Sequence, residues 1–281
     1  MRNTITLLAA LGAAALAMPA FATEPVTLRY HPHLGQVAVY RLTLRAEGEQ
    51  TSLGERRPVR LEAELELREQ ATATSPAQGF WLRTKARLVR VKDPSGVFAA
   101  AARNGPAEIE LQVTTRGEVL ASRTPHEDPY GPLRRAFGSL MAQPGGLVVL
   151  PEGPIGEGQT WQWQKDADRQ TTRLVSFVNG PSGLVVRLSS TCASPLSLAE
   201  ASEGIGLTTR LSGTKTQVSQ LDILVDKGVV LHNKGHLLVT TNGEMTLDLP
   251  EGVRRFPVSS RMRIAFDLRL VGTEAEAPHA K

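Results

Sequence analysis

The sequence has a single cysteine, Cys192, and almost no surplus of charge of either sign. One cysteine excludes an internal disulfide, although an exported protein is free to use one. The 32 lysines and arginines face 28 aspartates and glutamates, which leaves a net charge of +4 at pH 7. A balance of charges this close to even argues against an electrostatic nucleic-acid binder, whose basic residues should gather on one face. We therefore expect no nucleic-acid partner.

Long apolar runs are missing beyond the first segment of the chain. That segment, MRNTITLLAALGAAALAMPAFA, has one charged residue, Arg2, and an apolar stretch over residues 5–17. At about 1.5 Å per residue, a helix of that length is too short to cross a hydrocarbon core of about 30 Å. The small residues of Ala20-Phe21-Ala22 are typical of a signal-peptide cleavage site. The sequence predicts a signal peptide over residues 1–22, cleavage after Ala22, and a periplasmic or secreted protein without a membrane span.

Sequence signatures of catalysis are also missing. There is no Gly-x-Ser-x-Gly motif around a nucleophilic serine, and Cys192 has no charged neighbour that would activate its thiol. The glycines of PEGPIGEGQTW, residues 151–161, lead into a strand-like run and lack a following Lys-Ser/Thr pair, so they do not match a phosphate-binding loop. No pair of carboxylates stands out either. We predict a non-enzymatic protein without a cofactor.

Two pairs of histidines are candidates for a metal site. His232 and His236 share one side of a predicted strand but are about 13 Å apart along it, too far for one Zn²⁺ with bonds of about 2.1 Å. His31 and His33 are closer, at about 7 Å, but no second pair of ligands lies near them in the sequence. We therefore predict solvated histidines at sheet edges and no metal site.

Alternation of apolar and polar residues dominates the rest of the chain. The stretch LEAELELR, residues 61–68, places Leu61, Ala63, Leu65 and Leu67 on one side and charged residues on the other. This period of two is typical of a half-buried strand, since a helix would scatter the leucines around its circumference. The same pattern recurs at Ala38-Tyr40-Leu42-Leu44, Phe80-Leu82-Ala86-Leu88, Ile109-Leu111-Val113, Leu184-Val186-Leu188 and Met262-Ile264-Phe266-Leu268-Leu270. Cys192 continues the row of 184–188, which predicts a buried core thiol.

Asn-Gly pairs separate several of these stretches. Asn104-Gly105, Asn179-Gly180 and Asn242-Gly243 supply the positive φ angles of tight turns, and the last pair predicts a two-residue hairpin. A meander of antiparallel strands follows from this arrangement. We also predict that outward charges pair between residues 61–69 and 80–91. The acidic members are Glu62, Glu64 and Glu66, and the basic members are Arg83, Lys85 and Arg87.

One amphipathic helix is predicted at residues 128–142, DPYGPLRRAFGSLMA. Asp128 suits the N-cap, Pro129 suits the first turn, and Gln143-Pro144-Gly145-Gly146 ends the helix. Its apolar face comprises Leu133, Ala136, Phe137, Leu140 and Met141. A weaker helical turn is predicted over Pro195–Glu203. The tail, residues 273–281, has no apolar period and is predicted to be disordered.

Short stretches of the first half recur in the second half. Three pairs correspond: LGQVAVYRL at 34–42 with EGQTWQWQK at 157–165, GFWLRTKARL at 79–88 with GLVVRLSSTC at 183–192, and TTRGEVLAS at 114–122 with VDKGVVLHN at 225–233. Their shared order predicts two similar antiparallel units, residues 23–127 and 147–272, joined by the helix and turn at 128–146. The alternative is that antiparallel sheets with glycine turns resemble one another by default.

These elements carry a resemblance to a family. LRYHPHLGQVAVYRLTL, VTTRGEVLAS, the predicted helix and LPEGPIGEGQTWQW resemble an uncharacterised family of secreted or periplasmic bacterial β-rich proteins of unknown function. More loosely, a strongly curved, half-barrel-like antiparallel sheet with helices against its concave face is similar to the periplasmic lipoprotein-carrier fold. The resemblance implies a fold and a compartment and supplies no catalytic residue. Lipoprotein members of such families begin with a lipidated cysteine, which this sequence does not have.

Two functions remain open. In the first, an apolar cavity between the concave face and the helix binds a lipid or another hydrophobic ligand. Its predicted lining comprises Leu133, Phe137, Leu140 and Met141 from the helix and Phe80, Leu82, Leu184 and Val186 from the sheet. In the second, the core is filled, and the protein is an envelope protein-interaction or structural module that meets a protein partner through a strand edge or its outer surface. A cavity of roughly several hundred Å³ favours the ligand, and close packing favours the module.

Overall fold

The structure, a computed structural model, describes residues 24–75, 79–94, 107–123, 147–202, 207–249 and 252–275. These residues form eleven β-strands and one short 3-10 helix, η3 (Val225–Lys227). The strands are β1 (Gln36–Ser52), β2 (Glu55–Ser75), β3 (Gly79–Lys92), β4 (Ala107–Val113), β5 (Val119–Arg123), β6 (Thr160–Lys165), β7 (Asp168–Gly180), β8 (Gly183–Ser202), β9 (Leu207–Leu224), β10 (Val229–Leu249) and β11 (Gly252–Ala275).

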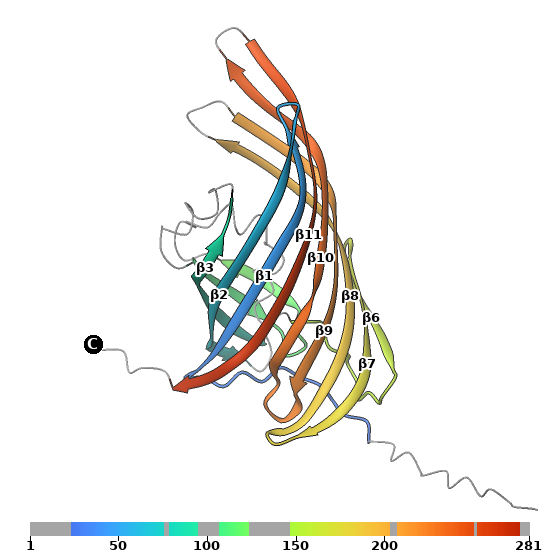
Figure 1. The fold of residues 1–281 in the computed structure, drawn as a ribbon. Helices are drawn as coiled ribbons and strands as arrows, with labels where there is room; N and C mark the ends of the chain where they lie inside the picture. The colour runs from blue at the N-terminus through green and yellow to red at the C-terminus, as the bar shows by residue number, and fades with distance from the viewer. Residues whose placement is uncertain are drawn as a thin grey trace, which may run out of the picture.

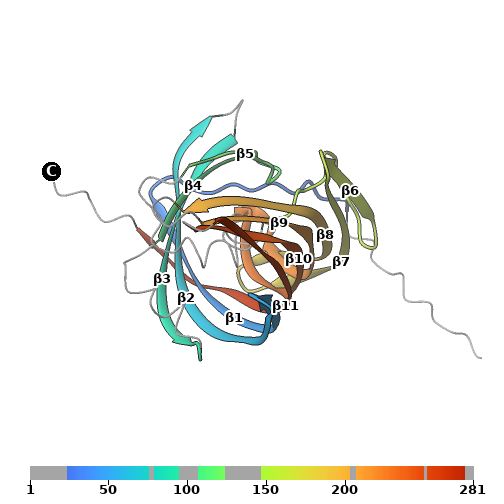
Figure 2. The same ribbon diagram turned by 90° about the horizontal axis from the view of Figure 1, so that it is seen from above.

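All eleven strands belong to one antiparallel sheet (Figure 1). Its order is β5-β4-β3-β2-β1-β11-β10-β9-β8-β7-β6, so strands from the two halves of the chain meet where β1 pairs with β11. The sheet curls around a concave face without closing into a barrel, because the edge strands β5 and β6 do not pair with each other (Figure 2). The prediction of a mainly β protein with an antiparallel sheet is confirmed. Two separate units are not supported, since the described strands form one continuous sheet.

The period-two alternation decides which side chains are buried. On β2, Leu61, Ala63, Leu65 and Leu67 are each at most 7% exposed, because they point to the concave side of the sheet. Two clusters of apolar side chains fill that side. One is built on β1, β2, β10 and β11, with β3 contributing at its border, and the other joins β3 and β4 to β7, β8 and β9. The apolar rows that the sequence predicted therefore make the core.

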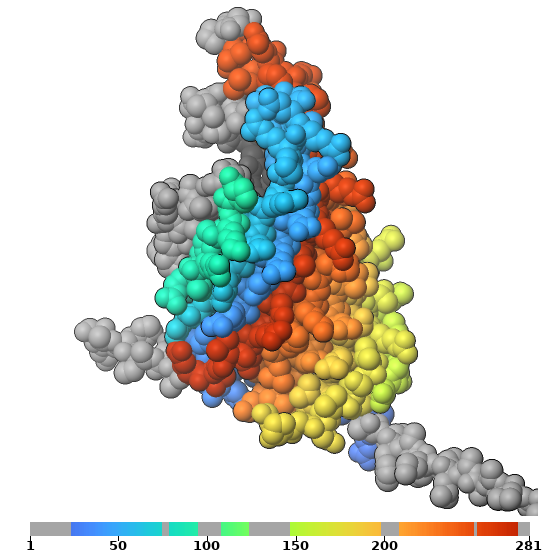
Figure 3. Space-filling model, in the orientation of Figure 1, coloured from blue at the N-terminus to red at the C-terminus, as the bar shows by residue number. Residues whose placement is uncertain are grey.

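Charged side chains alternate outward and pair across neighbouring strands of the convex face, which Figure 3 shows as a continuous surface. Glu66 on β2 pairs with Arg87 on β3, as predicted, with 3.1 Å between Oε2 and Nη2. Arg83 and Lys85 pair instead with Glu108 on β4, at 3.1 and 3.6 Å, because the register places neither of them opposite a glutamate of β2. Such exposed pairs contribute about 0–1 kcal/mol each.

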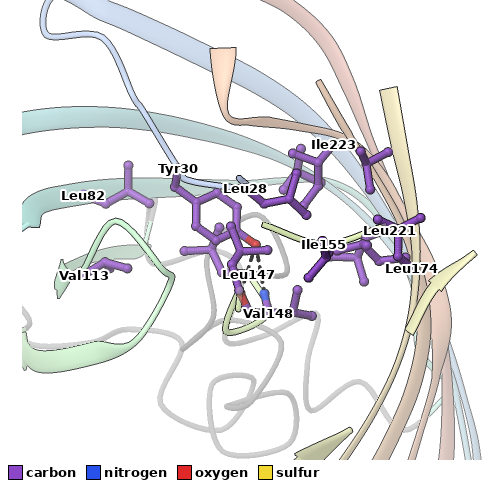
Figure 4. Packing of buried hydrophobic residues seen from close by; sticks show 14 of the residues in the cluster. Leu28, Tyr30, Leu82, Val113, Leu147, Val148, Ile155, Leu174, Leu221 and Ile223 are labelled. Carbon is purple, nitrogen blue, oxygen red and sulfur yellow. Dashed lines mark hydrogen bonds between the residues drawn. The ribbon is translucent and has the colours of Figure 1, made fainter. Parts of the chain in front are cut away.

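Two irregular segments lie against the concave side. Residues 24–35, the N-terminal segment, cross the open side of the sheet, and residues 147–158, the linking segment, run beside them (Figure 2). Val26 and Ile155 exchange two backbone hydrogen bonds of 2.9 Å. The Tyr30 hydroxyl donates to the Val148 carbonyl and accepts from the Val148 N–H, both at 3.1 Å (Figure 4). Side chains of these segments therefore pack between the two flanks of the curled sheet.

The linking segment also bridges the two edges of the sheet. The Leu150 N–H donates to the Arg116 carbonyl at 2.7 Å in the β4–β5 turn, and the Gln170 amide of β7 donates to the Val149 carbonyl at 3.0 Å. Trp163 of β6 donates its indole N–H directly to the Glu118 carboxylate at 2.6 Å. These bonds hold β5 and β6 near each other without a backbone ladder between them.

The recurring glycine stretches form turns that contact the same residues. Gly117 lies in the β4–β5 turn and Gly228 in the β9–β10 turn, with φ angles of +94° and +57°. A Cβ at Gly117 would lie 2.7 Å from the Tyr30 ring, and one at Gly228 would lie 2.4 Å from the Arg29 carbonyl oxygen. Both turns need glycine because the N-terminal segment passes directly against them. A true duplication of the two halves stays a prediction.

Three local predictions are wrong for described residues. The helical turn over Pro195–Glu203 is wrong, because β8 continues to Ser202 and pairs with β9 along its length. The Asn242-Gly243 hairpin is wrong, because both residues lie inside β10, where a Cβ at Gly243 would come within 1.9 Å of the Arg210 carbonyl oxygen. The predicted start of the disordered tail, at residue 273, is too early, because β11 runs to Ala275.

Other predictions have different outcomes. Asn179-Gly180 ends β7 just before the β7–β8 turn, but neither residue has the predicted positive φ, which belongs instead to Gly183 at +122°. The signal peptide at 1–22, the helix and turn at 128–146, Asn104-Gly105 and the last residues of the tail lie outside the described residues. Across the ranges that the structure describes, no helix has both the length and the hydrophobicity that crossing a bilayer requires.

Substitution of Gly228 tests the contact between the β9–β10 turn and the N-terminal segment. We expect Gly228→Ala to lower the free energy of unfolding by about 2–4 kcal/mol, because it combines a left-handed backbone with a clash against the backbone of residues 29–31. Gly54→Ala is the matched control, since its φ is +80° but no atom lies within 4 Å of its added Cβ. It should cost about 1–2 kcal/mol in urea unfolding. Equal losses in the two variants would contradict the contact.

Candidate functional site

A carboxyl group lies on the buried side of β2, in the row of apolar residues. Glu69 follows Leu67 and precedes Ala71 in the inward-facing positions, and it is only 7% exposed. In the sheet it stands opposite Ala38 of β1 and Thr84 of β3. The backbone therefore places a titratable group where the pattern of the strand calls for an apolar one.

Glu69 lines a small cavity of about 70 Å³ between the end of the sheet and the N-terminal segment. The buried part of its wall comprises Tyr30, Tyr40, Glu69, Ala71, Phe80, Leu82, Leu147, Gly228 and Val230. Exposed residues at its mouth comprise His33, Gln36 and Thr273. This volume holds a few water molecules or a small organic group, since one water needs about 10–15 Å³ by the same measure.

The Glu69 carboxyl has no hydrogen-bond partner for Oε1 within the described part of the chain. Thr84 Oγ1, on the residue directly opposite in β3, is buried and unpaired as well. A buried polar group without a partner costs about 1–3 kcal/mol, and a charged group costs more. Two such groups side by side mark a place in the described fold where polar side chains are not satisfied by the chain itself; Ser219 Oγ on β9 is a single unpaired oxygen elsewhere.

Burial changes the protonation of the site. Desolvation raises the pKa of the Glu69 carboxyl from 4.5 to about 8, because the neutral acid is easier to bury than the carboxylate. Desolvation also raises the pKa of the Tyr40 hydroxyl, with smaller contributions from the nearby Glu69 and Tyr30. At pH 7 Glu69 is therefore mostly a neutral carboxylic acid among aromatic and aliphatic side chains.

Glu110 shows what a buried glutamate looks like when the fold does satisfy it. It is 2% exposed on β4, and Arg83 Nε donates to its Oε1 at 2.7 Å while Arg123 donates to Oε2. Burial acts to raise the pKa of Glu110, but the hydrogen bonds from Arg83 and Arg123 outweigh it and hold the pKa below its ordinary value. None of the described arginines bonds the Glu69 Oε1 oxygen, so this carboxyl differs from the ion-paired carboxyl of Glu110.

The structure brings together part of the predicted ligand-binding set. Phe80 and Leu82 line the Glu69 cavity. Val186 is completely buried in the neighbouring apolar cluster, and Leu184 lies near the β7–β8 turn; neither lines this cavity. Leu133, Phe137, Leu140 and Met141 lie outside the described residues.

One of the histidines considered as a metal ligand is paired inside the sheet. His232 Nε2 lies 2.9 Å from Asp267 Oδ1 across β10 and β11, so this histidine sits mid-sheet and not at an edge. Within the described ranges, no three His, Cys, Asp or Glu side chains are grouped so that they would hold a metal ion. Cys192 is half-buried, and desolvation raises the pKa of its thiol, which makes it less nucleophilic.

Sequence reasoning missed Glu69, although a signal was present. The row Leu61, Ala63, Leu65, Leu67 continues by parity to residue 69, so a glutamate there is an acidic residue in a buried row. The outward glutamates of the same strand hid it, because they made an acidic residue look ordinary. The packing of the N-terminal segment over residue 69, by contrast, has no local signal in the sequence.

Comparison with known proteins adds no assignment. No protein-family model matches this sequence, and a search of the curated proteins also finds no match.

Substitution of Glu69 by glutamine tests its protonation through stability. A carboxyl with a folded pKa of about 8 and an ordinary value of 4.5 destabilises the fold increasingly as the pH rises between those values, because the unfolded chain loses its proton first. We expect Glu69→Gln to gain stability relative to the parent by an amount that grows from near zero at pH 4 to on the order of 3 kcal/mol at pH 7.

The measurement is urea unfolding of both proteins at several pH values between 4 and 8. Glu66→Gln, which faces outward on the same strand, is the control and should show no comparable trend. A constant difference between the Glu69 variant and the parent across this range would contradict a buried, neutral acid.

Proposed function

We propose that the protein is a non-enzymatic binding protein for a small hydrophobic ligand with one polar end, and that the Glu69 cavity receives that end. The unpaired, buried carboxyl carries the proposal. A fold that leaves a polar group unsatisfied in its interior loses stability there, and such sites are typical of binding and active sites. A ligand that donates a hydrogen bond to Glu69 would recover the lost interaction.

The walls of the cavity support an apolar ligand. Apart from Glu69, its buried wall is aromatic, aliphatic or glycine, which is the usual composition of a small-molecule site with a few polar groups that fix orientation. Tyr30 is fixed by its bonds to Val148, so that wall is formed before a ligand arrives.

The size of the cavity limits what enters it. A volume of about 70 Å³ accepts a head group or a short chain and is too small for a whole lipid, since typical ligand sites hold roughly 300–1,000 Å³. A longer apolar tail would leave through the mouth beside His33 and Gln36. The predicted larger cavity beneath residues 128–142 is a separate proposal, because those residues are outside the described part.

The compartment proposed for this function is the periplasm or the extracellular medium. We expect the full-length chain, expressed in a Gram-negative host, to yield a processed protein whose N-terminus is Thr23. The reason is the apolar stretch followed by Ala20-Phe21-Ala22. Intact-mass measurement of the periplasmic fraction checks the cleavage site. An unprocessed cytoplasmic protein would contradict it.

Native mass spectrometry of protein purified from its own host tests the binding function. We expect an additional bound mass that organic extraction removes. Ala71→Leu should abolish it, because Ala71 is 3% exposed and lines the cavity, so a larger side chain fills the space. Ala193→Leu, at an exposed position of β8, is the size-matched control and should retain the bound mass.

Two outcomes would contradict the binding function. One is a mass equal to that of the bare chain in the parent protein, which would favour a filled structural or protein-interaction module. The other is loss of the bound mass in both variants, or retention in both, because the ligand would then lie elsewhere. Circular dichroism and thermal unfolding establish that Ala71→Leu is folded before its spectrum is compared.

A further inference from the structure

We infer that the polar end recognised by this cavity is a primary ammonium group, so that the ligand class is small alkylamines and amine-headed amphiphiles. This inference rests on the proposed function and narrows it from hydrophobic ligands in general to cationic ones. It is carried by three features of the same cavity: an acceptor without a donor, an aromatic wall, and the absence of a competing cation from the described lining residues.

The acceptor is the carboxyl of Glu69, which lines the cavity and whose Oε1 is buried without a hydrogen-bond donor from the described chain. A primary ammonium group supplies three N–H donors on one compact atom. One of these donors can bond the Glu69 carboxyl, which lines the cavity. Thr84, which carries a second unpaired oxygen, stands opposite Glu69 on β3 but does not line the cavity.

The wall contains three aromatic rings, from Tyr30, Tyr40 and Phe80. Aromatic faces attract cations through the ring quadrupole, and the attraction grows when both partners are removed from water. The same rings also pack against the first carbons of an alkyl chain. A carboxyl surrounded by aromatic rings is thus suited to a group that is positive at its head and apolar behind it.

Among the described residues that line the cavity there is no lysine or arginine. This separates Glu69 from Glu110, whose charge is already neutralised by Arg83 and Arg123. An anionic ligand would face a carboxyl with no positive group beside it, which is unfavourable at low dielectric. A ligand cation, in contrast, supplies the positive charge beside Glu69 that the described lining residues do not supply.

Binding of the ammonium group exchanges one positive charge for another. The neutral Glu69 acid releases its proton to solvent as the cation enters, and the resulting carboxylate pairs with the ammonium. The titratable groups around the cavity are Tyr30, Tyr40 and, at the exposed mouth, His33. Both tyrosines stay neutral because burial raises the pKa of each hydroxyl. Glu69 is therefore the buried group whose proton the ligand displaces.

The direction of the pH dependence follows from this exchange. Below the Glu69 pKa of about 8, each decrease of one pH unit reduces the ionised fraction of Glu69 about tenfold. The affinity for the ammonium group should therefore fall about tenfold per unit as the pH is lowered. The affinity of a neutral hydrogen-bonding ligand does not rise with pH in this range. Such a ligand binds the protonated acid, so its affinity weakens only as the pH rises past 8. The two ligand classes are therefore separated by the sign of one slope.

The experiment compares n-butylammonium with n-butanol, which have the same length and differ in charge. Binding is followed by amide chemical shifts of Ala38 and Thr84, the cross-strand neighbours of Glu69, at pH 6, 7 and 8 and constant ionic strength. We expect butylammonium to bind more tightly than butanol at pH 8, with an affinity that rises about tenfold from pH 6 to pH 7.

Two variants complete the test. Glu69→Gln should weaken butylammonium binding about 10-fold or more at pH 8 and remove its pH dependence, while preserving the shape of the cavity. Glu66→Gln, which changes the charge of β2 on the outward face, should leave both affinities unchanged. Amide spectra of each free variant establish that it is folded.

The outcomes distinguish this inference from the proposed function. Butanol binding at least as tightly as butylammonium, with an affinity that does not rise between pH 6 and pH 8, overturns the ammonium assignment and leaves a hydrophobic ligand in place. Equal butylammonium binding by the parent and by Glu69→Gln also overturns the assignment. Failure of both compounds to shift these amides at tens of millimolar overturns the assignment and the proposed cavity together.

Discussion

The hydrogen bonds between the Tyr30 hydroxyl and the backbone of Val148, both at 3.1 Å, join the two segments on which the interior depends. An open antiparallel sheet needs a cover for its apolar concave face. Here the cover is irregular chain, and its polar backbone must be paired in a buried setting. Tyr30 satisfies both groups of one residue while its ring packs against the β4–β5 turn at Gly117. One side chain thereby fixes the N-terminal segment, the linking segment and an edge of the sheet.

The same arrangement creates the Glu69 cavity. The cover ends near the mouth, where His33 and Gln36 are exposed, and the inward row of β2 continues beneath it. Where the neighbouring outward glutamates have arginines at hand, Glu69 has aromatic and aliphatic walls. The physical character of the site, a neutral acid at pH 7 in a small apolar space, thus follows from where the cover lies and from which side of β2 residue 69 occupies.

The sequence predicts the strands well because burial on one face imposes a period of two over long stretches. It predicts turns less well. Asn242-Gly243 resembles a hairpin turn, but the glycine is needed where β10 approaches the Arg210 carbonyl of β9, a contact between residues far apart in the chain. Pro195, which the sequence places in a helical turn, lies in β8 because the pairing of β8 with β9 continues on both sides of it. Non-local contacts decided both cases, and single-sequence patterns do not contain them.

For the site, the sequence identifies the walls and misses the polar group. Phe80 and Leu82 follow from alternation, whereas Glu69 was hidden among the outward acidic residues of β2. Parity alone places it on the inner face, but its lack of a partner depends on residues 30–36 folding back over the end of the sheet. That return path is set by the glycine turns at 117 and 228 and by Tyr30, which a local pattern does not reveal.

The most direct test is the titration of the Glu69 carboxyl carbon by ¹³C NMR in protein with labelled glutamate, assigned with Glu69→Gln. We expect a pKa of about 8 for this resonance, well separated from the outward glutamates of the same strand. A midpoint near 4.5 would mean that the carboxyl is solvated or paired, and it would contradict a buried, unsatisfied acid at the centre of the site.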